Sequence, residues 1–431
     1  MIKRLAFAAA LLASAACSAQ PQGSPESQQN AMGGAQEAPS SRPPVTELPQ
    51  NAPAGSVRNV PATTGRGNLP QTKPPFQVET IGHFDAPFAM AFLPDGRLLV
   101  TEKAGRLKLR NPDGRVQDVT GVPAVATGGQ GGLLDVAVAP DFGRTGHIYL
   151  TYAEPGEVGS QLALARATLS AHGYGGSAKK APPSEDLALD LPDWQVIWRS
   201  GSVGVGGQFG AKIAFSPDGK YLFLSSGERQ RFTPAQDPDQ ALGKILRLTL
   251  DGKAAPGNPM YAAGGVRAMT WTSGHRNPYG LVFTPDGRLW EEEMGPKGGD
   301  ELNLLEPGRN YGWPIVSNGD NYSGQPIPDH PSRPDLAAPT VWWSPSISPS
   351  GMIYYSGDLF PQLKGSLLIG AMSTPGLMHV TLNGASATAA DFWDFGSRIR
   401  DVAQAPDGAI WLLEDGTKGA DGKLLRLTPA R

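Results

Sequence analysis

Two arginines near the C-terminal end of the chain have a spacing that suits anion binding. Arg398 and Arg400 flank Ile399 in a stretch with β-strand character. Because alternate residues of a strand point to the same face, both guanidinium groups would lie on one side. Paired guanidinium groups bind carboxylates and phosphates through charge-assisted hydrogen bonds. The pair therefore predicts an anion site, although two arginines on an exposed edge strand would have the same spacing.

Two further segments combine polar side chains with turn residues. His275, Arg276 and Asn277 place an imidazole, a cation and an amide in one turn ahead of an apolar run. The segment 295–303 carries two carboxylates after a series of loop residues. Carboxylate and free carbonyl oxygens are ligands that a hard cation such as Ca²⁺ accepts. An ordinary surface turn and a solvated glycine-rich loop are the respective alternatives.

Composition excludes several other kinds of chemistry. The chain has one cysteine in 431 residues, so a disulfide framework and a cysteine-based zinc site are excluded. It contains no Walker loop, nucleophile elbow, His-Glu-x-x-His motif or EF-hand loop, and its six histidines form no ligand-spaced cluster. The net charge of −3 argues against nucleic-acid binding, which needs a basic surface.

The elements that must position these residues repeat along the chain. A short apolar run leads into Pro-Asp-Gly or a variant and then into a second strand-like run, which is typical of a β-hairpin. Six copies of this phrase occur, at residues 91–96, 138–142, 214–219, 282–287, 347–351 and 405–408. A second phrase, Gly followed by alternating apolar and basic residues, marks further strands at 105–110, 243–248 and 422–427.

Six ordered hairpin phrases predict an all-β, six-bladed β-propeller over residues 76–431. A propeller blade has four strands, and blades of about 40–50 residues with loop insertions fit the spacing of the copies. Residues 76–81 are a candidate strand for closing the ring against the last blade. In a propeller, the polar segments above would converge on one end of the central channel. A β-sandwich with chance similarity between its turns is the alternative.

The N-terminal part of the chain is typical of an exported protein. Lys3 and Arg4 precede an apolar stretch that ends in small residues and Cys17, as in a secretory signal, and Ser14 to Cys17 resembles a bacterial lipobox. We expect residues 1–17 to be a signal peptide with a lipidated Cys17, and the mature protein to be periplasmic and membrane-anchored only through that lipid. An ordinary signal peptide is the alternative. Residues 18–75 contain no aromatic residue and are expected to be a disordered linker.

Together the polar segments resemble the soluble aldose dehydrogenases of the glucose/sorbosone dehydrogenase family, which use pyrroloquinoline quinone (PQQ). The resemblance covers nearly all of residues 76–431. The motifs that carry it, in order along the chain, are 129–134, 208–210, 274–278, 295–303, 308–314, 349–352 and 398–402. The family implies a six-bladed propeller with PQQ and calcium over the central channel, and oxidation of a sugar at its anomeric carbon to a lactone.

The resemblance also implies roles for individual residues. PQQ carries three carboxylates, for which arginines and a calcium ion are suitable counter-charges. The residues expected to contact the cofactor are Gln130, Arg276, Asn277, Tyr322, Arg398 and Arg400. The carbonyls of Gly295 and Pro296 would hold the cofactor's calcium, while Glu301 and Tyr311 match positions that bind a separate, structural calcium in some relatives.

Two departures from the family pattern concern catalysis. The family's general base is a histidine that opens the motif His-Phe-Gly-Gly-Arg-Leu, whereas here the same place begins with Gln208. An amide can orient a hydroxyl group but cannot deprotonate it near neutral pH. Asp300 supports that histidine in relatives and has no imidazole to orient here. Ser373 stands where the family has a lysine near the cofactor, so the pocket has one cation fewer.

Three functions remain open on this evidence. The first is a PQQ-dependent sugar dehydrogenase, slow or with another base such as Asp135 or Glu228. The second is a relative with lost or altered catalysis that binds a sugar, a glycan or a quinone. The third is a calcium-dependent lactonase, which would need a cluster of carboxylates at the channel. The sequence names neither the sugar, the electron acceptor nor the oligomeric state.

Overall fold

The computed structural model describes residues 72–171, 188–416 and 421–430. The predicted signal peptide and residues 18–71 of the predicted linker lie outside this part of the chain, so both stay predictions. In the described part nearly all regular structure is β-strand. The helices are short: α1 (Phe142–Thr145), α2 (Gly265–Met269) and the 3-10 turns η3 (Thr233–Ala235), η4 (Tyr261–Ala263) and η5 (His330–Ser332).

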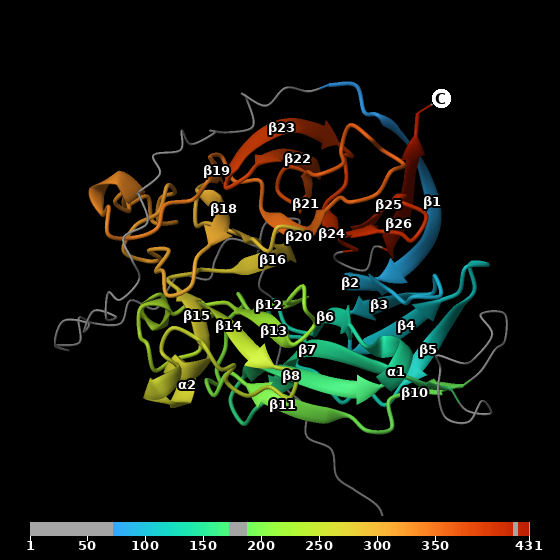
Figure 1. Cartoon of the computed structure of the whole chain (residues 1–431), viewed down its shortest axis with the longest axis horizontal. Coiled ribbons are helices and arrows are strands. Elements are labelled where there is room, and N and C mark those ends of the chain that lie inside the picture. Colours follow the sequence, from blue (N-terminus) through green and yellow to red (C-terminus); the bar gives the residue numbers. More distant parts are fainter. Residues whose placement is uncertain (1–71, 172–187, 417–420, 431) are drawn as a thin grey trace, which may run out of the picture. The chain divides into compact units, whose positions relative to one another are not determined.

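The strands form six sheets arranged in a ring, as Figure 1 shows. Each of the first three sheets is given from its innermost strand outward. The first blade is β2 (Pro87–Phe92), β3 (Leu98–Glu102), β4 (Arg106–Arg110) and β5 (Val116–Thr120), extended by β10 (Leu189–Asp190) and β9 (Ser170–Ala171). The second is β6 (Leu133–Val138), β7 (His147–Pro155), β8 (Ser160–Thr168) and β11 (Gln195–Arg199). The third is β12 (Gly210–Phe215), β13 (Tyr221–Ser226), β14 (Lys244–Thr249) and β15 (Thr270–Ser273).

The remaining three sheets complete the ring. The fourth blade is β16 (Pro278–Phe283), β17 (Leu289–Glu293), β18 (Asp300–Leu305) and β19 (Val341–Trp343). The fifth is β20 (Pro349–Tyr354), β21 (Leu367–Ala371), β22 (Gly376–Asn383) and β23 (Ser386–Asp394). The sixth is β24 (Ile399–Gln404), β25 (Ile410–Glu414), β26 (Asp421–Pro429) and β1 (Phe76–Asp85). The innermost strand of each blade packs against those of its two neighbours, so the fold is a six-bladed β-propeller, as the hairpin repeat predicts.

The first strand closes the ring. β1 pairs antiparallel with β26, from Phe76 opposite Pro429 to Asp85 opposite Asp421. In Figure 1 the blue start of the described chain therefore lies against its red end. The predicted closing strand 76–81 is confirmed and is four residues longer than expected. Because β1 pairs with β26, the third strand of the sixth blade is not exposed as an unpaired edge.

Five of the six hairpin phrases form the turn between the first and second strands of a blade, and the prediction for 347–351 is wrong. In that segment Pro349 already begins β20, and β20 is joined to β21 by the longer connection 355–366. Gly351 takes no positive φ, unlike the turn glycines Gly96 and Gly287. A Cβ at position 351 would collide with Asp401 of the next blade. The glycine at that position therefore permits close packing between blades rather than a turn.

Strand direction separates the two ends of the channel. All six innermost strands run in the same direction along the channel. The Pro-Asp-Gly turns that follow them therefore lie at one end of it. The segments that lead into the innermost strands, and the connections from second to third strands, lie at the other end. The segments with predicted chemistry lie at this second end: most precede an innermost strand or connect a second strand to a third. Tyr311 and Tyr322 lie on the connection from β18 to β19, which returns to the same end through bridges to Ser273 and Lys297. We call this the site end of the propeller.

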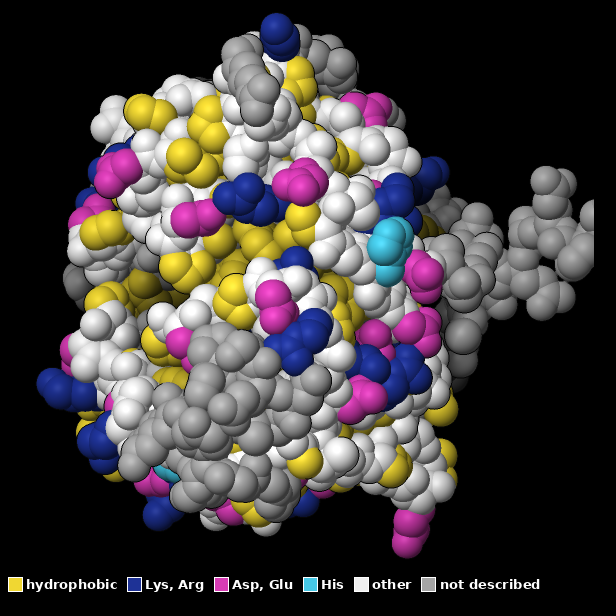
Figure 2. All heavy atoms as spheres, turned by 90° about the vertical axis from the view of Figure 1, so that its right-hand side faces the viewer, with side chains coloured by type: hydrophobic (Ala, Val, Ile, Leu, Met, Phe, Trp, Pro, Cys, Tyr) yellow, Lys and Arg dark blue, Asp and Glu magenta, His cyan; other side chains and the backbone are white. Residues whose placement is uncertain are grey.

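Large apolar side chains fill the space between neighbouring blades. For example, Trp290, Trp343, Met352 and Phe392 pack in one buried cluster between the fourth and fifth sheets. None of the helices in the described ranges is long and apolar enough to cross a membrane. On the side of the ring shown in Figure 2, the acidic and basic side chains of the described residues are intermixed over the surface.

Candidate functional site

A lysine and two carboxylates cross the centre of the channel. The Lys212 ammonium group of β12 lies 3.0 Å from Oδ1 of Asp135 on β6 and 3.5 Å from Oδ1 of Asp401 on β24. The second oxygens of the two carboxylates accept backbone N–H groups of Ile213 and Met90. Burial disfavours the charged lysine, but the two carboxylates outweigh burial and raise the pKa of Lys212. The cluster therefore joins the inner strands of four blades.

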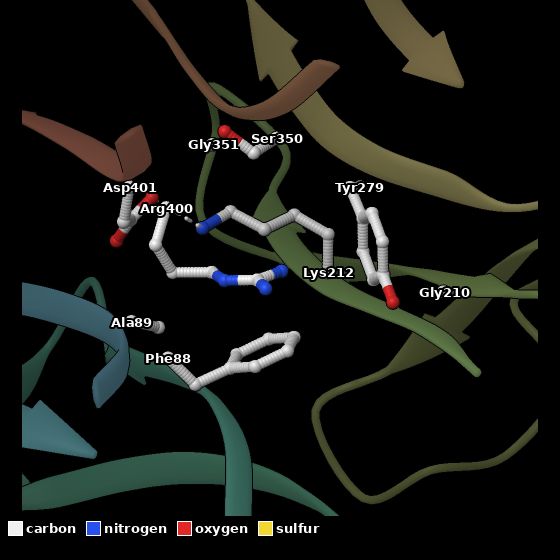
Figure 3. Close-up of a pocket in the computed structure, with 9 residues that line it drawn as sticks. All are labelled: Phe88, Ala89, Gly210, Lys212, Tyr279, Ser350, Gly351, Arg400 and Asp401. Atoms are coloured by element: carbon white, nitrogen blue, oxygen red, sulfur yellow. Dashed lines mark ion pairs between the residues drawn. The ribbon is translucent and has the colours of Figure 1, made fainter. Parts of the chain in front are cut away.

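A small pocket opens above this cluster, as Figure 3 shows. In the figure the guanidinium group of Arg400 lies between Lys212 and the ring of Phe88, with Tyr279 beside them. The pocket is lined by Phe88, Ala89, Gly210, Lys212, Tyr279, Ser350, Gly351, Arg400 and Asp401. The Arg400 guanidinium carbon lies 5.3 Å from the centre of the Phe88 ring, within cation–π range. An anion or a flat ring entering here would meet a cation and two aromatic faces.

The two predicted arginines meet at a single carboxylate. Arg398 Nε donates to Oδ2 of Asp415 over 3.0 Å, and Nε and Nη2 of Arg400 donate to Oδ1 over 2.9 and 2.8 Å. Lys103 Nζ adds a third cation, 2.9 Å from the same Oδ1. Both arginines therefore face the same way, as their alternation predicts. Arg398 remains 43% exposed, whereas the Asp415 side chain is fully buried.

The charges in this group are not balanced. Three cations share one carboxylate, which leaves a surplus of two positive charges within this group of side chains. Although burial favours neutral Asp415, Arg400 and Lys103 hold the pKa of that carboxyl well below its usual range. Burial, with Arg400 close by, lowers the pKa of Lys103. Partly buried cations whose charges repel one another are stabilised by an anionic ligand. We refer to Lys103, Arg398, Arg400 and Asp415 as the cationic group.

Gln208 lies in a turn that its backbone could not adopt without strong local support. Its φ of 55° is in the left-handed region, and its side chain is buried. The Gln208 backbone N–H donates to Oε1 of Gln130 over 2.7 Å, and its own Oε1 accepts the N–H of Gln230 over 3.2 Å. The structure thus brings two of the predicted residues, Gln130 and Gln208, into direct contact. A left-handed conformation is one that histidine also tolerates better than most residues.

Arg276 and Asn277 connect this turn with the pocket. Oδ1 of Asn277 accepts the N–H of Gly210 over 3.2 Å. The guanidinium group of Arg276 donates to the carbonyls of Met294, over 3.0 Å, and Gly295, over 2.6 Å. The same group lies 5.3 Å from the ring of Trp313 and 5.9 Å from that of Tyr322, which is 75% exposed. These contacts place the predicted cofactor residues of blades two to four around one side of the channel mouth.

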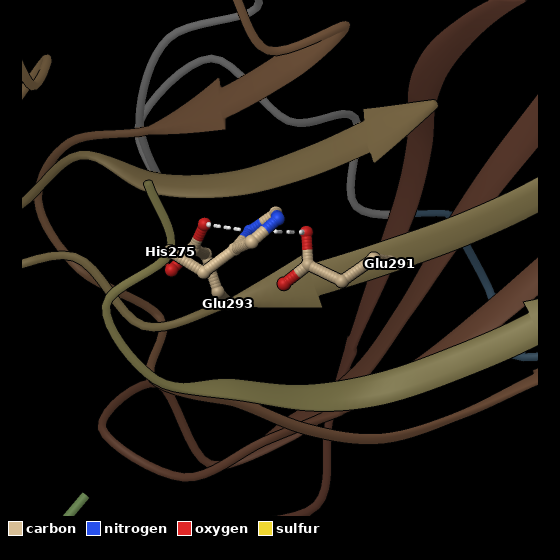
Figure 4. Close-up of side chains that lie close together, drawn as sticks. All are labelled: His275, Glu291 and Glu293. Carbon is tan, nitrogen blue, oxygen red and sulfur yellow. Dashed lines mark hydrogen bonds and ion pairs between the residues drawn. The ribbon is translucent and has the colours of Figure 1, made fainter. Parts of the chain in front are cut away.

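A glutamate that sequence reasoning missed holds the Arg276–Asn277 turn in place. Oε2 of Glu293 accepts the backbone N–H groups of Arg276, over 2.5 Å, and Asn277, over 3.2 Å. Its Oε1 lies 3.1 Å from Nδ1 of His275, which is also 3.8 Å from Glu291, as Figure 4 shows. Burial and the charge of Glu293 raise the pKa of Glu291 well above its usual value. Three successive glutamates within a buried strand, 291–293, are the signal that would have found this support.

These three side chains have the composition of a metal site, but His275 and Glu293 already have partners for all their polar atoms, and only Oε1 of Glu291 has none. The second ring nitrogen of His275, Nε2, lies 2.9 Å from the hydroxyl of Thr272, so both nitrogens have hydrogen-bond partners. Both oxygens of Glu293 also have partners. The ring of Tyr311 stacks on His275 with 4.9 Å between centroids. The arrangement therefore holds the turn at residues 275–277 in place from its buried side.

Asp300 joins two loops of the site end. Its Oδ1 accepts the N–H of Gly295, and its Oδ2 accepts Ser346 Oγ and the N–H groups of Ile347 and Ser348, all within 2.8 Å. Burial raises the pKa of Asp300 to about 6, against these hydrogen bonds. None of its hydrogen bonds in the described structure reaches Gln208. The carboxylate in the turn next to Gln208 is instead Glu228, two residues before Gln230.

Three of the four calcium ligands predicted from the resemblance lie close together, and each already has a hydrogen-bond partner within the protein. Gly295, Glu301 and Tyr311 line one small pocket with Arg276 and Glu293. The Gly295 carbonyl already accepts a hydrogen bond from Arg276, and Glu301 lies 3.1 Å from Nε2 of His330. The Tyr311 hydroxyl donates to the carbonyl of Leu304. The calcium roles of Gly295, Pro296, Glu301 and Tyr311 therefore stay predictions.

Comparisons with known proteins agree with this geometry. Residues 84–426 match the Glucose / Sorbosone dehydrogenase family. The chain is 38% identical to the aldose sugar dehydrogenase YliI of Escherichia coli over 356 residues, which is 80% of this chain and 90% of the relative. A crystal structure of a glucose dehydrogenase is 40% identical, with a TM-score of 0.73 over 82% of this chain and 100% of that one.

A cofactor-bound structure is also among the similar proteins. The PQQ-bound aldose sugar dehydrogenase of Streptomyces coelicolor is 28% identical, with a TM-score of 0.64 over 83% of this chain and 99% of that one. The match of most of the chain to the family, the extent of the identity to YliI and the shared fold lead to one conclusion. This chain belongs to the glucose/sorbosone dehydrogenase family of PQQ-type β-propellers.

Proposed function

We propose that this protein binds PQQ at the site end and oxidises an aldose at its anomeric carbon to a lactone. The observation that carries the proposal is the cationic group, in which three cations share the one carboxylate of Asp415. A tricarboxylate cofactor supplies the negative charge that this group lacks. The family and its PQQ-bound member support the choice of PQQ among anions.

The residues around the mouth fit such a cofactor. Arg398 and Arg400 would pair with its carboxylates, with Lys103 adding positive charge behind them. Arg276, Asn277, Gln130 and Tyr322 would hold its other side. The rings of Phe88 and Tyr279, 6.0 Å apart, form an apolar boundary to the pocket beside Arg400. PQQ would supply a two-electron acceptor, so the protein's own residues need only orient the sugar and remove a proton from its hydroxyl group.

Calcium at this cofactor is the less supported half of the proposal. The carbonyl of Gly295, one expected ligand, is 2.6 Å from a guanidinium nitrogen of Arg276. A calcium ion bound there would repel that cation, so binding requires Arg276 to turn away from the carbonyl and toward the cofactor. We propose that calcium and PQQ bind together, because the carboxylates of PQQ neutralise both cations.

The Gln208 side chain favours a second candidate, a protein that binds a sugar or quinone and oxidises it slowly or not at all. The amide of Gln208 orients a hydroxyl without taking its proton. Asp135 is held by Lys212, and Glu228 accepts the N–H groups of Arg231 and Phe232, so both alternative bases have structural partners. A lactonase has less support, because the two carboxylates at the channel, Asp135 and Asp401, are both paired with Lys212.

For cellular location, we propose export to the periplasm and anchoring through a lipid on Cys17. The sequence pattern of residues 1–17 supports this proposal. Mass spectrometry of the mature protein tests it: a diacylated N-terminal cysteine is expected. An unmodified N-terminus at another residue would contradict lipidation and leave export intact.

Reconstitution tests the enzymatic proposal. The purified protein is titrated with PQQ in the presence of calcium, and reduction of an artificial electron acceptor is followed with a panel of aldoses. Binding of PQQ with measurable aldose oxidation supports the dehydrogenase. Binding of PQQ with sugar binding but no turnover supports the second candidate. A protein that takes up no PQQ under these conditions would contradict both.

A further inference from the structure

Phe232 is an aromatic side chain left exposed at the site end. It lies on the connection between β13 and β14, and 46% of its surface is accessible. Its backbone φ is 60°, in the left-handed region, as are those of Arg229 and Gln230 in the same turn. Such a conformation costs about 1–3 kcal/mol for a bulky residue and persists only where the surroundings enforce it. A strained backbone that keeps an aromatic ring exposed to solvent indicates that the ring has a function.

Two buried side chains enforce the conformation. Oε2 of Glu228 accepts the backbone N–H groups of Arg231 and Phe232, each over 2.5 Å. The guanidinium group of Arg229 donates to the carbonyls of Ser160, Gly204, Gly206 and Gly207 and lies 3.8 Å from the ring centre of Phe209. Both side chains are 1% exposed. The turn is therefore rigid, and it presents Phe232 in one fixed position.

The ring of Phe232 belongs to a stack that reaches the predicted cofactor residues. It lies 5.7 Å from the ring of Trp313 with an interplanar angle of 27°. Trp313 is 5% exposed, and its backbone is held by hydrogen bonds from its amide N–H to the carbonyl of Gly274 and from the Gln236 side chain to its own carbonyl. The Arg276 guanidinium carbon lies 5.3 Å from the same indole. The exposed ring thus packs on the same buried indole that Arg276 contacts.

We infer that the free face of Phe232, backed by Trp313, is a platform on which the C–H face of an aldopyranose ring stacks. Pyranose rings carry several C–H groups on one face, and these pack on aromatic rings while the hydroxyl groups stay hydrogen-bonded. A rigid aromatic platform beside a polar group gives orientation at a low cost in conformational entropy. The inference rests on the proposed function, because it assigns the sugar position of that site.

The experiment compares Phe232→Ala with Phe232→Tyr in the full-length protein reconstituted with PQQ and calcium. Val205→Ala is the matched control, since Val205 is 76% exposed but carries no ring. Steady-state oxidation of aldoses gives KM and kcat separately, and saturation-transfer NMR reports which sugar protons contact the protein. PQQ affinity is measured for each variant. We expect Phe232→Ala to raise KM roughly threefold to tenfold, the loss of one aromatic contact, and to leave kcat and PQQ affinity unchanged.

Saturation should be strongest on the C–H protons of one face of the sugar in the wild type, Phe232→Tyr and Val205→Ala. It should be lost from that face in Phe232→Ala. Equal KM values for all variants, or unchanged saturation in Phe232→Ala, overturn the platform. If the wild-type protein does not bind PQQ, the result contradicts the proposed function but does not yet test the platform. Saturation of the sugar on the cofactor-free protein then decides the platform: dependence on Phe232 supports it, and independence from Phe232 or absence of binding overturns it.

Discussion

The centre of the channel and its mouth use the same ionic groups in opposite proportions. In the centre, one cation, Lys212, stands between two carboxylates. At the mouth, the three cations of the cationic group share the one carboxylate of Asp415. The central cluster is complete within the protein and joins four blades. The cationic group has two more positive charges than negative ones, so it favours an anionic ligand. This difference in charge distinguishes the structural cluster in the centre from the proposed binding site at the mouth, although the sequence shows the same types of side chain in both.

Removing Arg398 and Arg400 together should have the largest effect. We expect Arg398→Ala with Arg400→Ala to weaken PQQ binding by about 3–6 kcal/mol, because each charge-assisted hydrogen-bond pair contributes roughly 1.5–3 kcal/mol. Equilibrium titration with PQQ measures the change. The control is Arg144→Ala, in α1 at the opposite end of the propeller. Unchanged affinity in the double variant would show that the arginines serve only Asp415.

Removing the central lysine should instead affect stability. Lys212→Met leaves two buried carboxylates without their cation, which destabilises by about 3–5 kcal/mol. Denaturant unfolding measures the loss, and Lys220→Met, at an exposed surface lysine, is the control. The contrast between centre and mouth fails if Lys212→Met unfolds like the wild type but loses PQQ affinity.

Restoring a base should separate slow catalysis from lost catalysis. We expect Gln208→His to raise aldose turnover by about 10²-fold, with a plateau near neutral pH, because an imidazole can take the hydroxyl proton. Activity of the wild type should rise with pH without such a plateau. Gln208→His with Ser373→Lys is the fuller test, since the lysine adds positive charge to the pocket, and Gln208→Ala is the control. Turnover that stays low in both histidine variants while PQQ is bound favours the binding protein.

The Asp415 carboxylate gives the mouth a characteristic pH dependence. Its pKa is lowered in the folded state, so its contribution to stability is present above the unfolded value of 3.8 and is lost as the pH falls below it. The difference in unfolding free energy between wild type and Asp415→Asn should therefore shrink below about pH 4, by about 1 kcal/mol between pH 4 and pH 3. Denaturant unfolding across pH 3–7 tests this. Asp358→Asn, at a carboxylate 88% exposed, should show no such change, and a constant difference for Asp415→Asn would contradict the account.

The smallest expected effect is at Ala211, between Gln208 and Lys212. Ala211 is buried with φ of 87°, where the family motif has glycine. Ala211→Gly should stabilise the fold by about 1 kcal/mol, because glycine adopts this conformation without strain. Thermal unfolding measures the gain. Ala214→Gly, in the same strand and without a positive φ, should destabilise by about 0.5–1 kcal/mol, and a loss of stability in both would show that Ala211 is unstrained.

The repeat predicted most of the fold because it is local. A Pro-Asp-Gly turn and its flanking strands lie within a dozen residues, so six copies indicated six blades even though one copy was misplaced. Gly351 misled because a glycine that permits packing against Asp401 reads the same in sequence as a glycine in a turn. The sequence pattern does not show that Asp401 of the next blade packs against this glycine.

The candidate site was predictable only where it is local or shared with the family. The alternation of Arg398 and Arg400 indicated a common face, and the structure confirms it. Lys103 and Asp415 were missed because 312 residues separate them, and only closure of the ring brings them together. Glu293 was missed for a related reason: it supports Arg276 and Asn277 from the adjacent strand of the hairpin. Partners of this kind follow from topology and not from spacing.

Calorimetric titration of the wild-type protein with PQQ at low and high ionic strength tests the central claim most directly. If the surplus positive charge at the mouth is the cofactor site, PQQ should bind saturably, with one molecule for each chain. Its affinity should fall as added salt screens the carboxylates of PQQ from the cationic group. Absence of saturable binding, or an affinity that does not change with salt, would contradict the account.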